Sequence, residues 1–207
     1  MKEKIIDYLI KTYNPEAIIT YGSYADGTAN ENSDFDALII ADSSKTHDES
    51  VVAGITLDVF IYSSEIDIEK EDMDEFIQIH DGVIELDKNG NALRLKEKVL
   101  SYIENIPLKS KEEICQEIEW CKKMLLRTKR NDAEGYFRWH WLLIESLEIY
   151  FDIIQKRYWG PKKALLQLRE IDSEAYKKYE AALKNFNQDT LSVWIDFMER
   201  KQGPGLG

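Results

Sequence analysis

The hydrophobic pattern of the chain changes at Ile106-Pro107, and this change constrains the fold more than any other feature. Before it, short apolar runs are separated by Gly, Asn and Asp, which is typical of strands and turns. After it, apolar residues recur almost continuously at helical spacing. We therefore expect an α+β chain: a mixed β-sheet domain over residues 1–106, followed by an all-α helical bundle domain over residues 107–207.

The expected elements follow from apolar runs and turn signals. In the first domain, helical spacing from Ile5 ends at Asn14-Pro15, a polar loop is expected over 42–50, and the acidic stretch 65–75 is expected to be a solvated loop or helix surface. Strands are expected over 17–21, 34–40, 55–62 and 82–86, and a helix over 91–105. In the second domain, helices are expected over 110–130, 134–157, 161–170, 172–186 and 188–201.

Charge is divided unevenly between these two parts. The chain has 27 basic and 39 acidic residues, a net charge of −12, but residues 1–106 carry 9 basic and 23 acidic side chains, a net of −14. Nucleic-acid affinity depends on neutralising phosphates, so this excess of acid argues against nucleic acid as a partner. The chain has neither a signal-peptide pattern nor a membrane-spanning run, and Cys115 and Cys121 are badly placed for a disulfide. We expect no membrane partner and a cytoplasmic location.

One set of residues predicts a binding site for a metal ion and a phosphate. Gly22-Ser23 follows an expected strand, ten residues then precede Asp34 and Asp36, and Asp58 lies within the strand expected over 55–62. Residues i and i+2 of a strand share a face, so Asp34 and Asp36 would present two carboxylates together. With Asp58 they form a hard oxygen site suited to Mg²⁺. Backbone N–H groups at Gly22-Ser23 can cradle a phosphate, and the Ser23 hydroxyl adds a donor.

This pattern resembles the motif of the nucleotidyltransferase superfamily related to DNA polymerase β, in which Gly-Ser, Asp-x-Asp and a third acid occur in this order. The helical half resembles the substrate-binding bundle of kanamycin and lincosamide nucleotidyltransferases. The resemblance implies an enzyme that transfers a nucleoside monophosphate from a triphosphate such as ATP to an acceptor hydroxyl and releases pyrophosphate. Asp34 and Asp36 would bind two Mg²⁺ ions, Asp58 would complete the catalytic metal site, and Ser23 would hold the β- and γ-phosphates.

The chain departs from this motif at one position. Many relatives have a basic residue in a Gly-Ser-x-Ala-Arg-Gly run, where this sequence has Asp26. An acid there removes one candidate partner for a phosphate. The departure bears on the strength of triphosphate binding and leaves the metal site unaffected.

Glu145 has two interpretations. On a helical wheel it shares a face with Arg138, Glu148 and Asp152, which is typical of a solvated stripe. The antibiotic nucleotidyltransferases use a Glu from this domain to deprotonate the acceptor, so the resemblance implies that Glu145 is a general base. Both interpretations stay open at the level of sequence.

The acceptor is expected to be a small hydroxylated molecule, and the acidic first domain favours a cationic one such as an aminoglycoside. Two alternatives remain: a protein AMP-transferase of the antitoxin type, and a non-catalytic nucleotide-binding module. The sequence leaves the nucleotide base and the oligomeric state open, a homodimer included.

Overall fold

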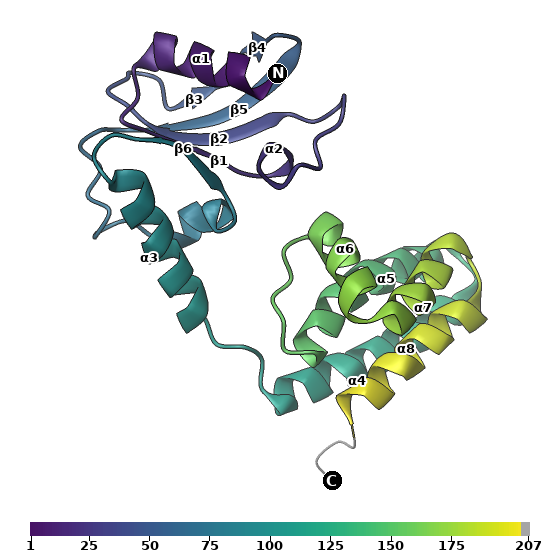
Figure 1. The fold of residues 1–207 in the computed structure, drawn as a ribbon. Coiled ribbons are helices and arrows are strands. Elements are labelled where there is room, and N and C mark those ends of the chain that lie inside the picture. The colour runs from purple at the N-terminus through teal and green to yellow at the C-terminus, as the bar shows by residue number, and fades with distance from the viewer. Residues whose placement is uncertain (204–207) are drawn as a thin grey trace. The chain divides into compact units, whose positions relative to one another are not determined.

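The computed structural model describes residues 1–203 and divides the chain into two compact units, Met1–Ile106 and a second unit that begins at Pro107 (Figure 1). The first unit contains a mixed sheet with helices, and the second is entirely helical, so the predicted α+β class is confirmed. Within residues 1–203, every helix is too short or too polar to cross a lipid bilayer.

The first unit is built on one mixed sheet with the strand order β3-β5-β2-β1-β6, and β4 pairs with β5. Strands β2 and β5 run parallel, whereas the other paired strands run antiparallel. In chain order the elements are α1 (Lys2–Tyr13), β1 (Ala17–Thr20), α2 (Ser23–Asp26), β2 (Phe35–Ile40), β3 (His47–Asp48), β4 (Val51–Val52), β5 (Ile55–Tyr62), the 3₁₀ helix η1 (Met73–Ile79), β6 (Val83–Asp87) and α3 (Asn91–Asn105).

Successive side chains along each strand of this sheet point to opposite faces. Residues Phe35, Ala37 and Ile39 of β2 pack in one core with Ile5 and Leu9 of α1. The period of two in a strand therefore directs the intervening residues of β2 to the opposite face. Figure 1 shows α1 along one face of the sheet and α3 on the other side. The face away from α1 carries Asp36 of β2 and its register partner Asp58 of β5.

Two predictions for this unit need correction. The expected loop 42–50 contains β3, in which Asp48 is only 2% exposed and accepts hydrogen bonds from Tyr13, Tyr8 and Ser50. These donors satisfy the buried carboxylate, so a polar segment can join the sheet. The acidic stretch 65–75 is not wholly solvated, because Ile68 and the first residue of η1 are buried.

The second unit is a bundle of α4 (Lys111–Arg127), the 3₁₀ helix η2 (Thr128–Arg130), α5 (Ala133–Ile153), α6 (Pro161–Ile171), α7 (Ser173–Lys184) and α8 (Gln188–Gln202). Its core surrounds Trp194, whose indole N–H donates to Ser146 Oγ at 2.9 Å. Helix α5 ends earlier than the predicted 157 because Gln155 takes a positive φ of 54°. Both cysteines are free, as expected.

Candidate active site

Two of the predicted carboxylates lie opposite one another on the sheet. Asp36 of β2 and Asp58 of β5 are register partners across the parallel strand pair. Neighbouring strands lie about 4.8 Å apart, so the two side chains stand side by side on the face away from α1. Both residues are partly buried. The sheet therefore places two negative charges together, although Asp36 and Asp58 lie far apart in the sequence.

Gly22 lies directly against the first of these carboxylates. Its backbone takes φ 63° and ψ −148°, a conformation that favours glycine. A Cβ atom at this position would lie 2.4 Å from Asp36 Oδ2, a separation that real Cβ atoms do not adopt. Ser23 follows as the first residue of α2, and its hydroxyl has no hydrogen-bond partner within residues 1–203. The phosphate-binding candidates Gly22 and Ser23 are thus brought next to Asp36.

Tyr21 lies beside both carboxylates and was not singled out from the sequence. Its side chain is only 8% exposed, and its backbone N–H donates to Asp36 O at 3.1 Å. Burial raises the pKa of the Tyr21 hydroxyl, and the charges of Asp58 and Asp36 raise it further. In the sequence, Tyr21 cannot be distinguished from the buried residues of the preceding strand.

His47 is the second residue that sequence reasoning missed. Its Nε2 lies 2.6 Å from Asp58 Oδ1, and its ring packs on Phe60 with 4.7 Å between ring centroids. The pair forms because β3 runs antiparallel to β5. Since His47 lies in a segment expected to be a loop, only this strand pairing could have located it.

Asp34 is placed differently from the other two carboxylates. It precedes the first residue of β2, is exposed, and its side chain has no hydrogen bond or ion pair among the described residues. Within residues 1–203, no group of three or more His, Cys, Asp and Glu side chains is arranged so that it could hold a metal ion. The predicted three-carboxylate site is therefore represented here by the adjacent pair Asp36 and Asp58.

The donor set of this pair nevertheless fits a hard divalent cation. Carboxylate oxygens are the ligands that Mg²⁺ prefers, and this ion commonly uses only one or two protein carboxylates together with substrate phosphates. Gly22 leaves space beside Asp36 Oδ2 that a side chain would fill. The pair thus offers oxygen ligands next to a backbone segment suited to a phosphate.

The acid at position 26 has a structural role. Asp26 Oδ1 accepts hydrogen bonds from the backbone N–H of Thr28 at 2.9 Å and from its hydroxyl at 2.5 Å. Such local bonds hold the turn that follows α2. Asp26 therefore stabilises the loop after Gly22-Ser23.

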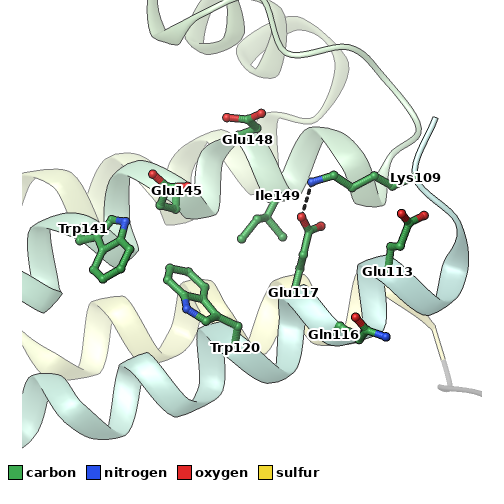
Figure 2. A pocket seen from close by; sticks show the side chains of 9 residues that line it. All are labelled: Lys109, Glu113, Gln116, Glu117, Trp120, Trp141, Glu145, Glu148 and Ile149. Carbon is green, nitrogen blue, oxygen red and sulfur yellow. Dashed lines mark hydrogen bonds and ion pairs between the residues drawn. The ribbon is translucent and has the colours of Figure 1, made fainter. Parts of the chain in front are cut away.

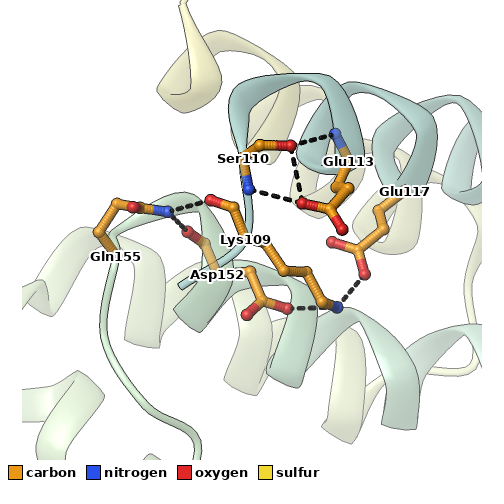
Figure 3. A network of polar contacts seen from close by, with 6 residues as sticks. All are labelled: Lys109, Ser110, Glu113, Glu117, Asp152 and Gln155. Atoms are coloured by element: carbon orange, nitrogen blue, oxygen red, sulfur yellow. Dashed lines mark hydrogen bonds and ion pairs between the residues drawn. The ribbon is translucent and has the colours of Figure 1, made fainter. Parts of the chain in front are cut away.

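Glu145 lies in the second unit, in the wall of a cavity of about 550 Å³ (Figure 2). In the structure, the residues of the solvated stripe predicted from the helical wheel have different ion-pair partners. Arg138 pairs with Glu134, and Asp152 pairs with Lys109 (Figure 3). Glu145 itself is exposed and has no ion pair within residues 1–203. The role of general base stays a prediction.

Comparisons with known proteins give one family match. A family model described as a nucleotidyltransferase domain matches residues 2–140, which include nearly all of the first unit and the second unit as far as the start of α5. No curated protein matches the chain. A solved nucleotidyltransferase-like protein from Exiguobacterium sibiricum 255-15 is similar, with 14% identity, coverage of 97% of this chain and 72% of that chain, and a TM-score of 0.40. A toxin–antitoxin structure with AMP-PNP has 19% identity, covers 51% of this chain and 88% of that chain, and has a TM-score of 0.33.

Proposed function

Because the chain belongs to the nucleotidyltransferase domain family and is therefore a nucleotidyltransferase, we propose that it transfers a nucleoside monophosphate to a hydroxyl of a small acceptor. The family implies a nucleoside triphosphate substrate, for which ATP is our candidate, and typically a divalent metal. The observation that carries the proposal is the contact of Gly22 with Asp36, the register partner of Asp58.

In this reaction the acceptor oxygen attacks the α-phosphorus, and the bond from that phosphorus to the bridging oxygen of pyrophosphate breaks. The hydroxyl proton passes to a base, and pyrophosphate leaves. Asp34, Asp36 and Asp58 are the residues that we propose for two Mg²⁺ ions. When bound, such ions would supply positive charge that favours the acceptor alkoxide and the leaving pyrophosphate.

The chain itself contributes orientation and donors. The unpartnered hydroxyl of Ser23 and the backbone at Gly22 would hold the phosphates of the triphosphate. Tyr21 places a neutral hydroxyl beside two carboxylates, because a tyrosine is protonated near neutral pH and burial raises the pKa of Tyr21 further. Glu145, an exposed carboxylate without an ion pair in the described chain, is our candidate for the base.

The test replaces Asp36 by Asn and measures pyrophosphate release from each of the four common nucleoside triphosphates, with and without a panel of hydroxylated acceptors that includes aminoglycosides. We expect Asp36→Asn to abolish acceptor-dependent release and to weaken Mn²⁺ binding measured by calorimetry. The matched control is Asp7→Asn, an exposed carboxylate of α1. An unchanged rate in Asp36→Asn would overturn the assignment of the metal site.

Two further experiments distinguish the proposed function from the two alternatives, a protein AMP-transferase and a non-catalytic nucleotide-binding module. Incubation of the enzyme with labelled ATP and cell lysate, followed by mass spectrometry, would detect labelled proteins if the acceptor is a protein side chain. Tight binding of a non-hydrolysable triphosphate without turnover of any acceptor would instead indicate a nucleotide-binding module.

A further inference from the structure

The turn at Gly22-Ser23 has no basic residue near it in the sequence. Between Lys11 and Lys45 the chain contains no Lys or Arg, and Asp26 adds an acid directly after the turn. Phosphate groups are negatively charged, and protein sites for them commonly combine backbone N–H groups with a basic side chain. A cation at this turn must therefore come from another part of the fold.

Lys2 of α1 brings an ammonium group to this turn. Its Nζ donates to Tyr24 O at 3.3 Å and pairs with Glu85 Oε1 of β6 at 2.6 Å. The side chains of Lys2 and Glu85 are only 31% and 19% exposed, so water screens this pair less than a fully exposed one. The fold thus places one cation against the backbone of the residue that follows Ser23.

The position of Lys2 is unfavourable for its own helix. Lys2 is the first residue of α1, where the helix dipole disfavours a positive charge. The carbonyl that it reaches belongs to α2, a four-residue helix whose own carbonyl groups lack partners within the helix. A cation is favourable at such carbonyl groups. The charge of Lys2 therefore contributes more to α2 than to α1.

A β-bulge places Glu85 within reach of Lys2. The register between β1 and β6 shifts between Ile18 and Ile19, which leaves Glu85 as the extra residue of β6. Bulges redirect side chains in this way and are frequent beside functional sites. Glu85 Oε1 also accepts a hydrogen bond at 2.8 Å from the hydroxyl of Thr20, which is fully buried. Glu85 is thus fixed to the strand that leads into Gly22.

These contacts hold the turn from both sides. Thr20 lies two residues before Gly22, and Tyr24 follows Ser23 directly. The hydroxyl of the first and the carbonyl of the second are bonded to the two members of one ion pair, and Lys2 is the member that contacts the far side of the turn. Removing this cation would release the far side while leaving the strand intact.

We propose that Lys2 is a positioning residue for the triphosphate: held by Glu85, its ammonium group fixes Tyr24 O and so keeps the Gly22-Ser23 backbone in place for the phosphates. This inference rests on the phosphate role proposed above for the turn. Because Lys2 acts through the turn, it should change how tightly the triphosphate binds and leave the rate of transfer at saturation nearly unchanged.

The test compares Lys2→Met with the parent by calorimetry, using a non-hydrolysable ATP analogue with Mg²⁺ and, separately, inorganic tripolyphosphate. We expect both ligands to bind about tenfold more weakly, as the loss of a hydrogen bond from a charged group implies. In pyrophosphate release the KM for ATP should rise by about the same factor, with kcat changed less than about twofold. A purely structural role would lower stability in urea without changing the KM of the folded enzyme.

Two control variants isolate the contact. Lys2→Arg keeps the charge and the reach, so it should bind the analogue within about threefold of the parent. Lys4→Met removes the same charge from an exposed residue of α1 that has no ion pair within residues 1–203, and it should bind as the parent does. Equal weakening in Lys4→Met and Lys2→Met would indicate a general effect of charge and would overturn the proposal.

A double variant separates positioning from repulsion, because Lys2→Met also leaves Glu85 without its cation. Lys2→Met/Glu85→Gln should bind the triphosphate no better than Lys2→Met. Binding restored to the parent level would show that repulsion by Glu85 caused the loss, and would overturn the proposal.

Two other outcomes separate this inference from the proposed function. Unchanged binding by folded Lys2→Met would overturn the role of Lys2, while transfer activity of the parent would leave the proposed function standing. A parent that binds neither the triphosphate analogue nor tripolyphosphate would overturn the phosphate role of Gly22-Ser23 and this inference with it.

Discussion

Replacing Gly22 by Ala is the sharpest test of the candidate active site. The new Cβ would lie 2.4 Å from Asp36 Oδ2, and ordinary van der Waals contact begins near 3.4 Å, so the carboxylate or the loop must move by about 1 Å. A displacement of this size at a reacting centre typically costs about 100-fold in rate. The backbone conformation of Gly22 adds strain of about 1–3 kcal/mol for any residue with a Cβ.

Gly27→Ala is the matched control. Gly27 also has a positive φ, 77°, but a Cβ there would meet nothing within 4 Å. Backbone strain alone should therefore lower its free energy of unfolding by about 1 kcal/mol. We expect both variants to lose stability in urea unfolding, while only Gly22→Ala loses about 100-fold in pyrophosphate release and binds Mn²⁺ more weakly. Equal activity of the two variants would refute the role assigned to the contact between Gly22 and Asp36.

Two further predictions concern hydrogen-bonded carboxylates. Burial opposes the charge of Asp172, but hydrogen bonds from the first turn of α7, Lys201 and Tyr150 lower its pKa from 3.8 to about 2. Asp172→Asn should therefore lower the free energy of unfolding by about 2 kcal/mol at neutral pH. A lowered pKa contributes its full stability only above the pKa that Asp172 has in the unfolded chain. In urea unfolding, the difference between the parent and the variant should therefore vanish as the pH falls from about 4 towards 2. Tyr13→Phe removes the hydroxyl that donates to Asp48 at 2.7 Å, so it should cost about 1 kcal/mol and raise the pKa of Asp48 in an NMR titration. An unchanged titration of Asp48 would contradict this account.

The order and type of most elements could be predicted from local patterns. Short apolar runs bounded by turn residues predicted β2 and β5, and helical spacing together with signals such as Pro161 predicted the bundle. The spacing of Gly22-Ser23 and Asp36 was sufficient to indicate the family that the family model then matched. These features depend on residues that are close together in the chain, and for this reason a single sequence is enough to predict them.

The partners of the site residues could not be predicted in the same way. The pairing of Asp36 with Asp58 and that of His47 with Asp58 depend on strand register between distant segments. The unneutralised charge near Glu145 depends on Lys109 being held by residues of two different helices. Register and side-chain pairing follow from the packing of the whole unit, so only the folded chain determined which charges meet a partner and which are left facing a cavity.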